Sequence, residues 1–113
     1  MVTVASDVTK SIREFIDLLE RGIKVEAVIL YGSHAAGRAA PDSDIDIAVV
    51  SPDFEGMGLF RRQEMIADLT VDRPDYLSPI GYPASEYHSP GPHSFLREII
   101  KRGRVVYEGR AVG

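Results

Sequence analysis

Two apolar runs rich in β-branched residues stand close together in the chain and limit the folds open to it. The first is KVEAVILYG at residues 24–32, and the second is IDIAVVS at residues 45–51. Both are typical of strands, and the first is apolar enough to be buried on both faces of a sheet. The link between them is about a dozen residues, which is the lower limit for a crossover between parallel strands. The sequence therefore predicts a small mixed β-sheet rather than an all-parallel one.

The rest of the chain alternates between helical and extended patterns. Apolar residues at helical spacing predict an amphipathic helix over residues 7–21, and Gly22 follows as a stop. The other expected elements are a short helix in 33–40, a helix over 59–70, a strand over 73–80, a loop over 79–92, a helix over 93–103 and a strand over 104–109. The apolar stripes of the last two helices are assigned to Leu59, Phe60, Ile66 and Leu69, and to Phe95, Leu96, Ile99 and Ile100. This order predicts an α/β (α+β) fold with helices packed on the sheet.

Composition bounds the domain count and the class of protein. The 113 residues, 44% of them hydrophobic, are enough for one small domain spanning residues 1–113. The sequence has no run of 18 apolar residues, so no membrane span is predicted. The N-terminus lacks the apolar segment of a signal peptide, and we therefore expect a cytoplasmic protein. Cysteine is absent, which excludes disulfides and thiolate metal sites. The formal net charge of −4 gives no signal for nucleic-acid binding by bulk electrostatics.

Two carboxylates open the second strand. Asp44 and Asp46 are two residues apart, so both side chains point to one face, while Ile45 and Ile47 point into the core. Like charges held side by side repel each other unless a cation lies between them. Oxygen ligands favour a hard ion such as Mg²⁺, which keeps coordination positions for water and phosphate. The pair therefore predicts a divalent metal site.

A Gly-Ser turn follows the first strand. Gly32 lets the backbone approach a ligand closely, and Ser33 opens the next short helix with exposed N–H groups and a hydroxyl that favour an anion. A phosphate-binding turn shortly before a metal-binding pair is what a nucleoside triphosphate site requires. No Gly-Lys-Ser/Thr is present, so this is not a Walker arrangement.

The combined stretch GSHAAGRAAPDSDIDIAVV resembles the signature of the nucleotidyltransferase superfamily related to DNA polymerase β. The short chain is similar to the minimal nucleotidyltransferase (MNT) domains of that superfamily. The resemblance extends from about Val25 to Glu108, because a later aspartate and the closing FLREIIKRGRVVYEG are also typical of the group. It implies the nucleotidyltransferase fold, which is like the palm of DNA polymerase β.

The resemblance also implies a reaction and a set of roles. Asp44 and Asp46 would hold two divalent ions, Mg²⁺, while Gly32 and Ser33 would hold the triphosphate of ATP. A nucleoside monophosphate, AMP, would pass to an acceptor hydroxyl, and pyrophosphate would leave.

The third carboxylate of the family has two candidates here, Asp75 and Asp72. We favour Asp75 as a catalytic and metal-binding residue, because Pro74 marks the entrance of the strand that Asp75 would begin. Ser43, just before the carboxylate pair, is a candidate nucleotide-binding residue. The chain departs from many members at His34, where arginine commonly follows Gly-Ser.

The resemblance implies a partner as well. Larger members carry a second domain for the acceptor, and the motif fold uses most of this chain, so the acceptor site would come from a partner or a second copy in a homo-oligomer. Minimal domains of this family often pair with a helical HEPN toxin, which they neutralise, in some systems by adenylylating a tyrosine. The alternative is a non-catalytic antitoxin that neutralises a HEPN partner by contact. A weaker reading is transfer to a small molecule.

Overall fold

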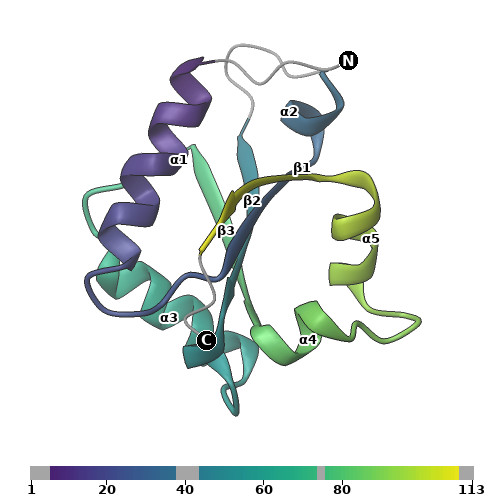
Figure 1. The fold of residues 1–113 in the computed structure, drawn as a ribbon. Coiled ribbons are helices and arrows are strands. Elements are labelled where there is room, and N and C mark those ends of the chain that lie inside the picture. Colours follow the sequence, from purple (N-terminus) through teal and green to yellow (C-terminus); the bar gives the residue numbers. More distant parts are fainter. Residues whose placement is uncertain (1–5, 38–43, 74–75, 110–113) are drawn as a thin grey trace.

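A computed structural model gives the fold of residues 6–37, 44–73 and 76–109 (Figure 1). Its elements in chain order are α1 (Ser6–Leu19), β1 (Ala27–Tyr31), α2 (Ser33–Ala36), β2 (Ile45–Ser51), the 3-10 turn η1 (Pro52–Phe54), α3 (Leu59–Leu69), β3 (Leu77–Pro83), α4 (Ala84–His88), α5 (Phe95–Arg102) and β4 (Arg104–Glu108). Within these three ranges, no helix is long and apolar enough to cross a membrane.

The four strands form one mixed sheet in the order β3-β2-β1-β4. β1 pairs antiparallel with β2 and with β4, whereas β2 and β3 are parallel and are joined through the crossover helix α3. The short link between β1 and β2 therefore reverses the chain direction, and the long link between β2 and β3 preserves it. The predicted mixed sheet is confirmed.

Helices cover both faces of the sheet, as Figure 1 shows. Val28 and Leu30 of β1 face the layer of α1 and α3, while Ala27 and Ile29 face the layer of α4 and α5. All four side chains are at most 1% exposed, because each face is covered by a layer of helices. The continuous apolar run of β1 follows from this double burial.

The amphipathic helix α1 supplies much of the core on its side of the sheet. The residues of its apolar stripe are 6% exposed or less: Val8, Ile12, Phe15, Ile16 and Leu19. They recur at helical spacing, so one face of α1 packs on the sheet and the other faces solvent. The helix predicted over residues 7–21 is confirmed, with its end at Leu19.

The predicted loop over residues 79–92 is wrong in its first part, where β3 runs to Pro83 and α4 follows. The predicted strand over 73–80 is displaced with it, because β3 begins at Leu77. β3 pairs with β2 along all of its seven residues. As an edge strand it has one side without a partner strand in the sheet, so a residue lacking an N–H is tolerated there.

Side chains from elsewhere in the chain complete the hydrogen bonding of this segment. The Gln63 amide of α3 accepts from the Gly81 N–H at 2.8 Å and donates to the Pro79 carbonyl at 2.9 Å. At the start of α4, the Glu55 carboxylate accepts from the Ser85 N–H at 2.7 Å and from the Ser85 hydroxyl at 2.9 Å. These long-range contacts order a segment whose composition alone favours a loop.

The apolar stripes assigned to α3 and α5 are only partly correct. Ile66, Leu96 and Ile99 are buried, but Phe60 is 84% exposed and Phe95 is 59% exposed. Both phenylalanines lie in the first turn of their helices, where the chain is still entering the layer that covers the sheet.

Candidate active site

Asp46 is the second residue of β2, an inner strand of the sheet. Its partner in β1 is Tyr31 and its partner in β3 is Ser78. The flanking Ile45 and Ile47, at 3% and 0% exposure, belong to the core beneath α1 and α3. Because side chains alternate along a strand, Asp46 points to the face on which α4 and α5 lie. The predicted inward position of the two isoleucines is confirmed.

The ionisation of Asp46 is affected by its surroundings. Asp44 immediately precedes β2 and is exposed, whereas Asp46 is half-buried. Burial raises the pKa of Asp46 above its ordinary value, the negative charge of Asp44 raises it further, and His34 partly offsets the two. The fold therefore holds a carboxylate where its ionised form is disfavoured, and a bound cation would relieve that cost.

Gly32 brings the turn after β1 against the same carboxylate. Its φ of 74° and ψ of −152° fall in a region that is essentially restricted to glycine. A Cβ atom at this position would overlap the Asp46 Oδ2. The backbone of the turn and the carboxylate thus occupy one site, although they are separated in the sequence.

The short helix α2 begins at Ser33, directly after this turn. It has one turn in the described residues, closed by a hydrogen bond from the Ala36 N–H to the Gly32 carbonyl at 3.1 Å. Gly32 has no side chain with which to cap the first N–H groups of α2, and Ser33 is half-buried beside them. N–H groups at the start of a helix favour an anion such as phosphate.

The donor set at this site fits a hard divalent cation. Asp44 and Asp46 supply carboxylate oxygens, the charge of Asp44 acts on Asp46, and Gly32 lets the backbone of the turn approach the Asp46 carboxylate closely. Over residues 6–37, 44–73 and 76–109, no group of three or more His, Cys, Asp or Glu side chains is placed to hold a metal. The described part of the chain therefore contributes two carboxylates, Asp44 and Asp46, to the candidate metal site.

Two of the predicted site residues, Asp75 and Ser43, lie outside the described residues. β3 begins two residues after Asp75, and the β3 residue opposite Asp46 is Ser78. Asp72, the other candidate for the third carboxylate, is exposed in the turn after α3. The assignment of a third carboxylate to Asp75 stays a prediction.

Two aromatic residues on the carboxylate side of the sheet were not singled out from the sequence. The Tyr31 ring is half-buried, and the pKa of its hydroxyl is raised by burial and then by the charge of Asp46. Phe95 meets the Tyr31 ring edge-on, with the ring centroids 6.1 Å apart. Tyr31 could have been recognised from its place directly before Gly32, at the end of a strand. For Phe95 the helical pattern gave the opposite signal, because it indicated a core residue.

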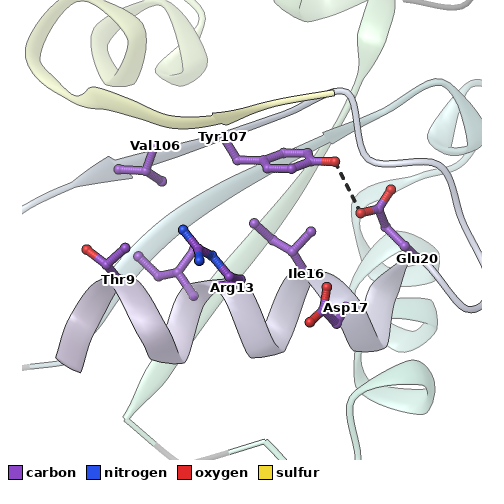
Figure 2. Close-up of a pocket in the computed structure, with 8 residues that line it drawn as sticks. Thr9, Arg13, Ile16, Asp17, Glu20, Val106 and Tyr107 are labelled. Atoms are coloured by element: carbon purple, nitrogen blue, oxygen red, sulfur yellow. Dashed lines mark hydrogen bonds between the residues drawn. The ribbon is translucent and has the colours of Figure 1, made fainter. Parts of the chain in front are cut away.

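A separate hollow of about 280 Å³ lies between α1 and β4 (Figure 2). Ile16 and Tyr107 line it, and the Tyr107 hydroxyl donates to the Glu20 carboxylate at 3.1 Å. Burial is the main cause that raises the pKa of Tyr107, and this hydrogen bond adds to it. Because α1 covers the other face of the sheet from Asp46, this hollow is not part of the carboxylate site.

Comparison with known proteins identifies the class to which this fold and site belong. The family described as "Polymerase beta, Nucleotidyltransferase" matches residues 13–110. The chain belongs to this family of DNA polymerase β-like nucleotidyltransferases. The match covers the Gly32–Ser33 turn and the Asp44–Asp46 pair together.

Individual relatives agree with this placement. A protein of Methanocaldococcus jannaschii named "Putative protein adenylyltransferase" is 29% identical over 102 residues, which cover 87% of this chain and 96% of the relative. The crystal structure of a protein described as a "putative nucleotidyltransferase" from Sulfolobus solfataricus superimposes with a TM-score of 0.71 at 20% identity, over 95% of this chain and 88% of the other. A structure described as "the toxin-antitoxin with AMP-PNP" gives a TM-score of 0.56 at 21% identity, over 90% and 74% of the two chains. Both structures share the fold.

Proposed function

We propose that this protein is a Mg²⁺-dependent adenylyltransferase that moves AMP from ATP to a hydroxyl group on a partner protein. The observation that carries the proposal is the close approach of Gly32 to Asp46, because it brings the turn that we propose binds phosphate against the carboxylate that we propose binds metal. Family membership supports nucleotidyl transfer as the class of reaction. The name of the M. jannaschii relative supports a protein as the acceptor.

The residues of the chain would share the work in three parts. The turn at Gly32 and Ser33 would bind the β- and γ-phosphates through backbone N–H groups and the serine hydroxyl. Asp44 and Asp46, with Asp75 as the proposed third carboxylate, would hold two Mg²⁺ ions. Ser43 would lie near the nucleotide. When bound, the ions neutralise charge on the triphosphate and lower the pKa of the acceptor hydroxyl.

The reaction balances without a further reactant. The acceptor oxygen forms a bond to the α-phosphorus while the bond from that phosphorus to the bridging oxygen breaks, so pyrophosphate leaves and AMP remains on the acceptor. The acceptor proton would pass to solvent or to one of the carboxylates of the site.

The partner we propose is a HEPN-family toxin that this protein neutralises as an antitoxin. The similarity to a toxin–antitoxin structure described with AMP-PNP supports such an assembly. The alternative, neutralisation by contact alone, predicts the same complex without transfer. The two differ in whether the carboxylates are required.

The test is transfer of label from α-³²P-ATP in the presence of Mg²⁺ and a candidate partner, the protein encoded by the gene next to this one. Wild type is compared with Asp44→Asn/Asp46→Asn and with Asp68→Asn, which removes an exposed carboxylate of α3 on the other face of the sheet. We expect label on the partner with wild type and the Asp68 variant, and none with the double variant. A complex that forms without any label on the partner would contradict transfer and support the contact mechanism.

A further inference from the structure

Phe95 is an exposed aromatic residue on a helix whose other apolar residues are mostly covered. Its side chain is 59% exposed, whereas Leu96 and Ile99 of the same helix are 0% and 3% exposed. Although the ring meets Tyr31 edge-on, the exposed part of it is apolar surface in contact with solvent. A ligand that covers the ring would gain the burial.

Phe95 belongs to a row of side chains that leads away from the carboxylates. Tyr31 pairs with Asp46 across the β1–β2 ladder, and Phe95 meets the Tyr31 ring at an interplanar angle of 86° with centroids 6.1 Å apart. Gly32, directly after Tyr31, lies against the Asp46 carboxylate at one end of the row. The order is therefore the Gly32 turn and the Asp46 carboxylate, then the Tyr31 ring, then the Phe95 ring.

The start of α5 is held in place, which makes the ring a preorganised surface. The Ser94 hydroxyl accepts from the Leu96 N–H at 3.2 Å and lies 3.0 Å from the Glu86 carboxylate, to which it donates. Leu96 and Ile99 anchor the same helix in the core beside β1. A fixed ring loses little conformational freedom when a flat ligand stacks on it.

We infer that Phe95 is the stacking platform for the purine base of the nucleotide, with Tyr31 beside the ribose. In a nucleoside triphosphate the ribose separates the α-phosphate from the base, and here one aromatic ring separates the Asp46 carboxylate from Phe95. Stacking uses the π-face that every base has, and a purine offers the larger face, so the platform favours ATP and GTP over CTP and UTP. The inference rests on the proposed nucleotide site and deepens it by assigning the base.

The experiment measures dissociation constants with Mg²⁺ present for ATP, CTP and inorganic triphosphate, the last having the phosphates without a base. Phe95→Ala is compared with wild type, with Phe95→Tyr, which keeps the ring, and with Phe60→Ala. Phe60 is the matched control because it is a phenylalanine of α3 that is 84% exposed. Stacking of one base on an aromatic ring predicts that Phe95→Ala raises the dissociation constant for ATP by about fivefold or more.

We expect Phe95→Ala to weaken the binding of ATP, to reduce the preference for ATP over CTP, and to leave the binding of inorganic triphosphate unchanged. The other two variants should bind all three ligands as wild type does. Wild-type affinity for ATP in Phe95→Ala would overturn the stacking role and leave the proposed function standing. Equal weakening of ATP and triphosphate would also overturn it, because the ring would then act through the fold. If wild type bound neither ligand, the proposed nucleotide site itself would fail, and the stacking role with it.

Discussion

Replacement of Gly32 by alanine should damage both the fold and the site. The backbone at Gly32 has a φ of 74° and a ψ of −152°, and a residue with a Cβ in this region costs about 1–3 kcal/mol. The added Cβ would also overlap the Asp46 carboxylate, which must then move. For a domain of this size we expect the melting temperature to fall by about 4 °C for each kcal/mol lost.

Gly56 provides the matched control, because its φ is 76° but a Cβ there meets nothing within 4 Å. Gly56→Ala should cost about 1–2 kcal/mol of backbone strain and leave the carboxylates in place. The assay is thermal unfolding with and without Mg²⁺ and ATP, since a ligand that binds the folded state raises the melting temperature. Gly56→Ala should keep the wild-type rise and Gly32→Ala should lose it. A full ligand-dependent rise in Gly32→Ala would refute the argument that the turn and Asp46 share one site.

Three further predictions concern charge and pH. Burial and then the charge of Asp44 raise the pKa of Asp46. Ionised Asp46 therefore lowers the free energy of unfolding. This loss is absent below pH 3.8 and is complete above the raised pKa that Asp46 has in the folded state. Without metal, Asp46→Asn should raise the free energy of unfolding at pH 8 by about 0.6 kcal/mol from the removed repulsion of charges about 7 Å apart in water, and the relief of burial adds to this gain. Urea unfolding at pH 3 should show no gain. Burial, mainly, raises the pKa of Tyr82 from 10.0 to about 12, so the fold should lose stability as pH rises from 10 to 12. Tyr82→Phe should remove about 1–2 kcal/mol of that loss in denaturant titrations; an unchanged alkaline limb would contradict it. Hydrogen bonds from the Ser85 N–H and hydroxyl lower the pKa of Glu55 below 4.5, so its contribution is present above pH 4.5 and is lost on acidification. Glu55→Gln should flatten the acid limb of stability against pH, and an acid limb as steep as that of wild type would count against this cap.

The parts of the fold that depend on local pattern were predictable from the sequence. The stripe from Val8 to Leu19 predicted α1, and the alternation of Ile45 and Ile47 with Asp46 predicted which face of β2 carries the carboxylate. Both signals come from residues whose environment is set by a regular period. Such periods are visible without knowing what the element packs against.

β3 and the start of α4 were not predictable in the same way. Pro79 and Pro83 favour a loop locally, but pairing with β2 and the amide of Gln63 supply the hydrogen bonds that make it a strand. Glu55 does the same for the start of α4 from a position 30 residues earlier. Contacts between distant residues override local propensity here.

The sequence predicted that the Gly-Ser turn and the carboxylate pair form one site, but it did not show how the fold brings them together. The motif named Gly32, Ser33, Asp44 and Asp46, but the antiparallel register of β1 and β2 is what places the turn against the carboxylate. Phe95 was expected in the core, because the helical period does not show where a short helix begins to cover the sheet.

The most direct test of the account is the position of a metal in crystals grown with Mn²⁺ and a non-hydrolysable ATP analogue, located by anomalous scattering. We expect manganese bound by Asp44 and Asp46, with the triphosphate against the turn at Gly32 and Ser33. Manganese bound away from both carboxylates, or a triphosphate away from that turn, would contradict the claim that these residues form one nucleotidyl-transfer site.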